Sequence, residues 1–223
     1  MRLRAAPLVL LPALLLGGSD PAPAAARSLL ASPPPGRLVD LVRPIVGTAR
    51  KDQAIGAVNS GQTFPAVGVP FGMTHWTPQT QPSEDKCVSP FYAQDERIHG
   101  IRASHWWSGS CTQDYGSATI AARVDGDAGE SASTREPAWL GALERGSSFS
   151  RAEEVMTPAY YAVTLPEHGV RVEATGTARA GILRLTFLRE GVAHLAVRAN
   201  RKSQGAIDGG GARVDPGRRA IAV

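Results

Sequence analysis

The feature that most constrains the fold is an alternation of apolar and polar residues in the C-terminal half of the chain. Successive side chains of a β-strand point to opposite faces, so alternation is typical of a strand with one buried and one solvated face. Gly169 lies where a turn between two of these runs needs a positive φ. Several such strands at short spacing predict an all-β fold, an antiparallel β-sandwich. The predicted strands are residues 161–165, 170–175, 183–187 and 194–199.

The N-terminal half is rich in Gly and Pro, which recur at short intervals through residues 39–80. Both residue types interrupt helices, so short strands and ordered loops are expected there and no helix of useful length. Residues 118–124 predict a further strand, and residues 125–136 a polar turn or loop. Four apolar residues are candidates for a small buried patch: Phe64, Val67, Val69 and Phe71.

The first residues have the three parts of a secretory signal: a basic start, an apolar run at residues 5–16, and small residues at 24–26. A membrane anchor is the alternative, but the apolar run is shorter than the roughly 20 residues that span a bilayer. Residues 1–26 are therefore predicted to be a signal peptide, and residues 27–37 a disordered Ala/Pro-rich lead. The domain itself is expected over residues 38–223, in a secreted or periplasmic protein.

The net charge of +4 comes mostly from scattered Arg residues, many of which alternate with apolar residues. Such a pattern is typical of a solvated face and not of a nucleic-acid patch. Beyond the signal, no segment is apolar enough to cross a membrane. We therefore expect neither a nucleic-acid nor a membrane partner.

Residues 104–116 combine two adjacent Trp with His, Gln, Asp and Tyr, a mixture that neither a helix nor a strand requires. Trp106 and Trp107 are candidate stacking platforms for a sugar, because an indole offers a large rigid contact area. A buried core role is their alternative. His105 is a candidate hydrogen-bond partner of a hydroxyl or a structural His, and Asp114 either binds a hydroxyl or caps a turn.

Cys87 and Cys111 are the two cysteines of the chain. An exported protein can oxidise them, and closing the loop between them would add roughly 3 kcal/mol of stability. A disulfide between them and a pair of free thiols both remain open. Two Cys without short His spacing do not predict a zinc site.

Four blocks carry a resemblance to a known family, and they occur in the family's order. Their sequences are VDLVRPIVGT at residues 39–48, GQTFPAVGVPFGM at 61–73, CTQDYG at 111–116, and TPAYYAVTLPEHGV at 157–170. They resemble the motifs of the N-terminal domain of glycoside hydrolase family 92, the calcium-dependent exo-acting α-mannosidases.

The resemblance implies a β-sandwich of the galactose-mutarotase-like (supersandwich) type, followed in the family by an (α/α)6 barrel. The chain is then a truncated, C-terminally incomplete member. Inversion at the anomeric carbon is implied, with the acid, the base and most calcium ligands on the missing domain. No catalytic or metal-binding residue is therefore assigned here. The implied partners are mannose-containing glycans and the missing C-terminal catalytic domain.

One departure from the family concerns the segment before Cys87. Many members carry a Trp there that contacts the leaving-group sugar, whereas this chain has Ser83-Glu84-Asp85-Lys86. Glu84 is therefore a candidate substrate contact, with a plain solvated loop as the alternative.

Three functions follow from these observations. The first is the carbohydrate-contacting N-terminal domain of an exported exo-α-mannosidase, which hydrolyses terminal α-mannosides of glycans; this chain alone would be inactive. The second is a stand-alone, non-catalytic carbohydrate-binding module. The third is an exported structural sandwich without a ligand, in which both Trp106 and Trp107 would be buried.

Overall fold

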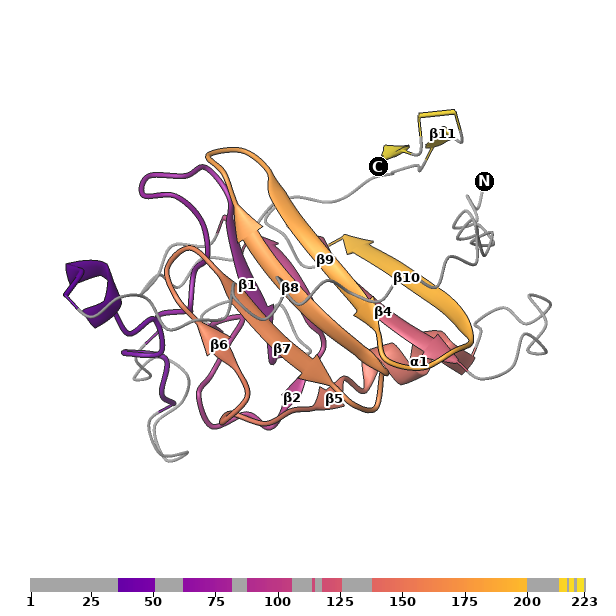
Figure 1. Ribbon diagram of the computed structural model, residues 1–223, viewed down its shortest axis with the longest axis horizontal. Helices are drawn as coiled ribbons and strands as arrows, with labels where there is room; N and C mark the ends of the chain where they lie inside the picture. The colour runs from indigo at the N-terminus through magenta and orange to yellow at the C-terminus, as the bar shows by residue number, and fades with distance from the viewer. Residues whose placement is uncertain are drawn as a thin grey trace, which may run out of the picture.

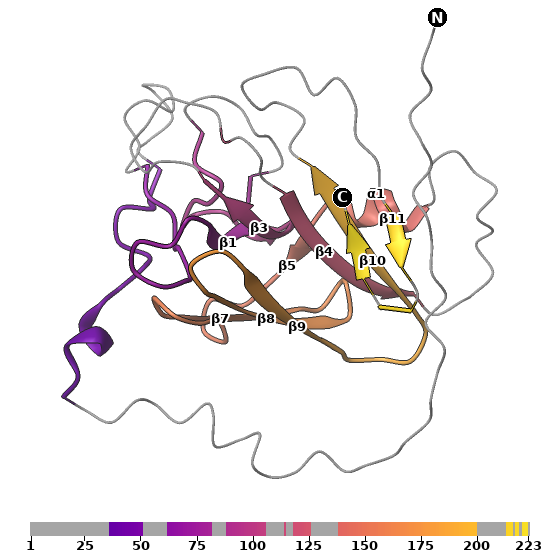
Figure 2. The ribbon, with the colours of Figure 1, turned by 90° about the horizontal axis from the view of Figure 1, so that it is seen from above.

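Two antiparallel four-stranded sheets face each other and form the body of the protein (Figure 1). The view from above shows them as two layers (Figure 2). This arrangement confirms the all-β sandwich predicted from the alternation. The computed structural model describes residues 36–50, 62–81, 88–105, 114, 118–125, 138–199, 213–215, 217–218 and 220–222.

One sheet, called the second sheet below, has the strand order β6-β7-β8-β9. It contains three of the four strands predicted from alternation. Val163 lies opposite Val172, so apolar residues of neighbouring strands share the inner face. Gly169 has a φ of 63° in the turn between β7 and β8, as predicted. The strands are β6 (Val155–Met156), β7 (Tyr161–Leu165), β8 (Val170–Gly176) and β9 (Gly181–Phe187).

The first sheet joins strands from both halves of the chain, in the order β1-β3-β4-β10. Its members are β1 (His75–Gln79), β3 (Gly100–Ser104), β4 (Ala118–Asp125) and β10 (Val192–Ala199). β4 and β10 confirm the strands predicted at 118–124 and 194–199. Since β10 follows β9 directly, the chain passes from one layer to the other at this edge (Figure 2).

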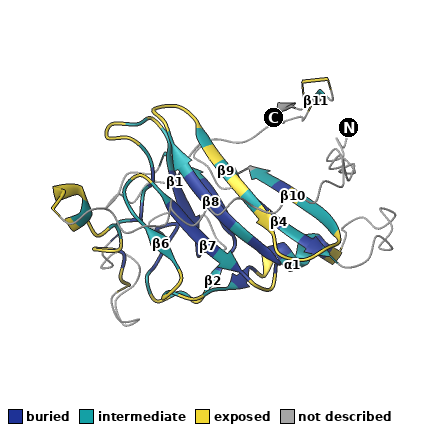
Figure 3. Cartoon of the chain, viewed as in Figure 1, coloured by how far each residue is buried: buried dark blue, intermediate teal, exposed yellow. Residues whose placement is uncertain are grey.

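The main hydrophobic core lies between the two sheets. Figure 3 shows the buried residues concentrated on the inner strands, whereas β9 at the edge is largely exposed. Burial of these apolar side chains provides the main favourable free energy of folding. The buried members are Val67, Trp76, Ile98, Ile101, Tyr161, Val163, Leu165, Val170, Val172 and Ala174.

A short helix, α1 (Ala138–Glu144), covers the outer face of the first sheet at β4 and β10. Trp139 and Leu143 of the helix pack with Ala121 and Ala196 of the strands. The Trp139 ring also stacks on His194, with centroids 4.7 Å apart. The sequence pattern does not predict this helix, because seven residues, one of them a Gly, are too few to show helical periodicity.

The remaining elements are small. β2 (Arg97–Ile98) pairs with β5 (Ser147–Ser148), and β11 (Arg213–Asp215) pairs with β12 (Ala220–Ala222). A 3-10 helix, η2 (Leu38–Leu41), is the only helix in the described part of residues 39–80, as expected from the Gly and Pro content. In the part of the chain that the structure describes, no helix has the length and apolar character needed to cross a membrane.

The predicted apolar patch was wrong for two of its four residues, Val69 and Phe71. Phe64 and Val67 are buried, with 7% and 1% of their surface exposed, but Val69 is 39% exposed and Phe71 completely exposed. The reason is a hairpin turn: Val67 pairs with Trp76, and the residues between them project from the sandwich.

Candidate functional site

The outer face of the first sheet is polar over β1, β3 and the start of β4. Trp76 and Ile101 belong to the inner core, so their neighbours along each strand point outward. The strand register places these outward residues side by side. We call the following set the polar face: Thr77, Gln79, Arg102, Ser104 and Thr119.

Every member of the polar face is buried, with at most 3% of its surface exposed. Buried polar groups are costly unless they are hydrogen-bonded, and here they bond one another. The hydroxyl of Thr119 donates to Oε1 of Gln79, and Nε2 of Gln79 donates to the carbonyl of Gln81 at 2.8 Å. The face is therefore an ordered polar layer that fixes the start of the loop after β1.

Asp114 lies against the polar face and organises it. Its Oδ2 accepts hydrogen bonds from Nε of Arg102 at 3.1 Å and from the hydroxyl of Ser104 at 2.7 Å. Its Oδ1 accepts from the backbone N–H of His105 at 2.9 Å. The Asp114 and Arg102 side chains are only 3% and 4% exposed. This carboxylate therefore holds the end of β3; its role as a sugar contact stays a prediction.

His105 is the first residue after β3 and the last described before the Trp106-Trp107 pair. Its Nε2 lies 3.0 Å from the hydroxyl of Thr74, and its Nδ1 is buried without a hydrogen-bond partner among the described residues. His75 lies nearby, and burial, followed by the charge of His105, lowers its pKa.

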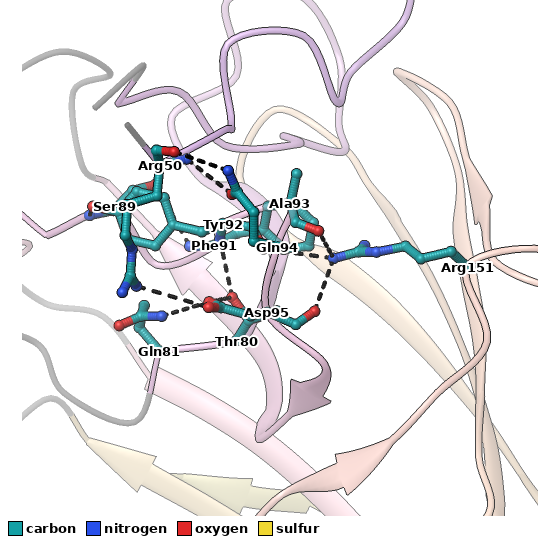
Figure 4. Close-up of polar contacts among 10 residues, drawn as sticks. All are labelled: Arg50, Thr80, Gln81, Ser89, Phe91, Tyr92, Ala93, Gln94, Asp95 and Arg151. Carbon is teal, nitrogen blue, oxygen red and sulfur yellow. Dashed lines mark hydrogen bonds and ion pairs between the residues drawn. The ribbon is translucent and has the colours of Figure 1, made fainter. Parts of the chain in front are cut away.

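A second polar cluster holds the segment between Phe91 and Asp95 (Figure 4). The guanidinium of Arg151 donates to the carbonyls of Ala93 at 2.9 Å and Asp95 at 3.2 Å. It also lies over the rings of Phe91 and Phe149, with its Cζ 4.9 Å and 4.5 Å from the centroids. One arginine thus fixes the backbone of this loop through hydrogen bonds and cation–π contacts.

On the other side of that loop, Arg50 and Gln94 bind each other reciprocally. The Gln94 amide accepts from the backbone N–H of Arg50 and donates to its carbonyl, both at 2.9 Å. The Arg50 guanidinium lies 4.3 Å from the centroid of the Tyr92 ring and 3.7 Å from Oδ1 of Asp95. Figure 4 shows that the guanidinium groups of Arg50 and Arg151 both reach Asp95.

Asp95 in turn fixes the residues that follow β1. Its Oδ2 accepts a hydrogen bond from the hydroxyl of Thr80 at 2.6 Å and another from the side-chain amide of Gln81. The chain continues from Gln81 towards Glu84 and Cys87. Asp95 therefore fixes the described residues just before Glu84, and the polar face fixes those just before Trp106 and Trp107.

Several predicted residues lie outside the described part of the chain, namely Glu84, Trp106, Trp107, Cys87 and Cys111. Their predicted roles, including the possible disulfide, stay predictions. Among the described residues, no three His, Cys, Asp or Glu side chains come together in a way that could hold a metal ion.

Four residues of the site were not predicted from the sequence: Gln79, Arg102, Ser104 and Asp95. A signal for the polar face was present, because Thr77 and Gln79 alternate with Trp76 and Pro78, and Arg102 alternates with Ile101 and Ala103. This alternation predicts a strand with a solvated polar face, and only the structure reveals that the face is buried. Asp95 gave no signal, since its partners come from distant parts of the sequence.

The described residues form a two-layer sandwich whose outer face over β1 and β3 is polar and buried. The model of the glycosyl hydrolase family 92 N-terminal domain matches residues 41–222, and the chain belongs to this family.

Solved structures support the same assignment. The chain is similar to the family GH92 inverting mannosidase BT2199 from Bacteroides thetaiotaomicron, with 28% identity and a TM-score of 0.55 over 71% of this chain. It is also similar to the family GH92 α-mannosidase BT3965 from the same organism in complex with mannoimidazole, with 27% identity and a TM-score of 0.52 over 68% of this chain. The matches cover only 19% and 18% of those chains. A comparison with curated proteins found no match.

Proposed function

We propose that this chain is the carbohydrate-contacting N-terminal domain of an exported exo-α-mannosidase. Family membership supports the proposal, together with similarity to a mannosidase bound to mannoimidazole. The observation that carries it in this chain is the polar face with Asp114, which holds His105 at the start of the Trp106-Trp107 loop. The terminal mannoside would stack on these indoles, with the unpartnered Nδ1 of His105 next to them.

The chemistry of glycoside hydrolysis limits what this chain does. Hydrolysis needs two carboxylates that flank the scissile bond, one to protonate the leaving oxygen and one to activate water. The two site carboxylates of the described residues, Asp95 and Asp114, are already engaged in holding loops. We therefore assign the acid and the base to the part of the mannosidase outside this chain.

Calcium belongs to the same proposal. The family resemblance implies that most calcium ligands lie on the domain outside this chain, and no cluster among the described residues would hold a metal ion. The role left to this domain is to bind and orient the sugar and to exclude water from one side of the site.

Tryptophan fluorescence tests the proposed contact. Methyl α-mannoside should shift the emission of the full chain, while methyl α-glucoside should have a smaller effect. Trp106→Ala and Trp107→Ala should reduce the response. Trp139→Phe is the matched control, because Trp139 of α1 is buried against the first sheet, stacked on His194, and should not respond. A wild-type protein that shows no response up to the solubility limit of the sugar would contradict the contact.

Hydrolysis of an aryl α-mannoside distinguishes this domain from a complete enzyme. We expect no turnover by the 223-residue chain. Measurable turnover would contradict the assignment of both catalytic carboxylates to the rest of the mannosidase.

Export is the last part of the proposal, and an intact mass tests it. Protein secreted by a bacterial host should begin at Arg27, after loss of residues 1–26. The same spectrum, with and without reduction, shows whether Cys87 and Cys111 are bonded. A mass that retains the first 26 residues would contradict the signal peptide.

A further inference from the structure

The hairpin between Val67 and Trp76 ends in a turn with an unusual residue. The N–H of Gly72 donates to the carbonyl of Val69 at 3.1 Å, which closes a four-residue turn with Pro70 in second place. Phe71, in third place, has a φ of 61°. Proline followed by a positive φ is the pattern of a type II turn, in which the third residue is normally Gly.

Phe71 gains nothing from this conformation within the chain. A bulky side chain in the left-handed region is strained, and such strain persists only where other contacts offset it. Phe71 has a relative exposure of 102%, so its ring packs against none of the residues that the structure describes. Strained backbone that presents a fully exposed aromatic ring indicates a contact outside the chain.

The hairpin is held firmly enough to present that ring. The N–H of Met73 donates to the carbonyl of Ala178 at 2.7 Å, and that of Gly68 to the carbonyl of Pro158 at 3.0 Å. The turn is therefore tied to the second sheet on both sides of Phe71. A side chain on a rigid base loses little entropy when it binds.

The surroundings of Phe71 are apolar. Val69 is 39% and Met73 64% exposed, on the same turn. The segment around η2, which projects from the same end of the sandwich in Figure 1, adds more exposed apolar residues. A sugar site would combine an aromatic ring with polar groups, whereas several exposed large apolar side chains mark a protein contact. The additional residues are Leu38, Leu41, Val42, Ile45 and Val46.

We propose that the turn Val69–Met73, with Phe71 at its tip, anchors this domain to the remaining part of a family 92 mannosidase. The inference rests on the proposed function. The lengths of the relatives favour this partner over a second copy of the chain. The chain spans 19% of BT2199 and 18% of BT3965, so most of such an enzyme lies outside it. A buried aromatic anchor is typical of the centre of a protein interface.

The test compares two proteins: the 223-residue chain and the product of the complete reading frame that contains it. Phe71→Gly should raise the Tm of the 223-residue chain by about 2 °C, because Gly relieves the strain at this turn. The same change should lower the Tm of the complete product, because the anchor is lost. Ile182→Thr is the matched control, since Ile182 is 64% exposed on β9, and it should change neither Tm appreciably.

Opposite signs in the two proteins support the proposal. A lower Tm in both would assign Phe71 a structural role, and a higher or unchanged Tm in both would show that nothing docks on it; either result overturns the proposal. A reading frame that adds nothing to the chain also overturns it, as does a dimer of the chain that Phe71→Gly dissociates. The mannoside titration is independent of these results, so the proposed function fails or stands separately.

Discussion

Strands β1 and β3 separate two buried regions, one stabilised by apolar packing and the other by hydrogen bonds and an ion pair. On their inner side, Trp76 and Ile101 join the apolar core between the sheets. On their outer side, Thr77, Gln79 and Arg102 form the polar face, equally buried but held by hydrogen bonds and by the ion pair with Asp114. An apolar core tolerates exchanges of similar volume, whereas a buried ion pair fails when either partner is lost. The polar face should therefore be the less tolerant region.

The largest expected effect follows from removing Asp114. Asp114→Ala leaves Arg102 charged and buried, which should destabilise the protein by about 3–5 kcal/mol. Urea unfolding of both proteins measures the loss. Asp95→Ala is the matched control, because the Asp95 side chain is 20% exposed and should cost less. A loss for Asp114→Ala below that of the control would show that the polar face tolerates the loss of the Asp114 carboxylate.

A double substitution sharpens this test. In Arg102→Met with Asp114→Leu, no charge remains buried, so much of the stability should return. The stability losses of Arg102→Met alone and Asp114→Leu alone should add up to more than the loss of the double variant. Strict additivity would mean that Arg102 and Asp114 act independently despite the 3.1 Å contact.

The inner region also contains a buried polar side chain, His168. Only 2% of its surface is exposed, both ring nitrogens lack a partner among the described residues, and it lines a cavity of about 10 Å³ that holds at most one water. Burial is the main cause that lowers the pKa of His168 to about 4, and the charge of Arg123 adds to it.

Acid should therefore weaken the inner region. The pKa of His168 is lower in the folded than in the unfolded protein, so the unfolded state binds more protons between pH 6.5 and 4. Stability falls as the pH falls through this window, by up to about 3 kcal/mol at its lower end. His168→Leu should flatten the slope, measured by urea unfolding from pH 7 to 4.5. Glu167, whose pKa is lowered to about 2 mainly by Arg97, contributes its loss only at lower pH. An equal slope in wild type and variant would exclude His168.

The two regions also differ in how far the sequence predicts them. The period-two alternation of β7, β8 and β9 follows from each strand alone, so these strands and their inner face could be predicted. The polar face depends on partners that lie far apart in the chain, such as Gln79 with Thr119, and no local pattern contains them. The same holds for Arg151, which reaches the loop of Asp95 from a distant segment. Motifs predicted the family, but not the residues that form the polar face and fix the segment around Asp95.

The smallest effect concerns Gly169, the turn residue that the sequence did predict. Its φ of 63° is in the left-handed region, and an added Cβ would lie 2.8 Å from both Nε of Arg189 and Cγ1 of Val124. Gly169→Ala should cost about 1–2 kcal/mol from backbone strain, plus a small amount for displacing the buried Val124, because only the Arg189 side chain can move aside freely. Gly217→Ala is the control: its nearest contact would be Oδ1 of Asp215 at 3.5 Å, and its φ does not require Gly. Urea unfolding midpoints of the two variants measure their losses of stability. An equal loss would mean that the β7–β8 turn does not depend on a positive φ. The inner region would then tolerate substitution at its edge better than its geometry indicates.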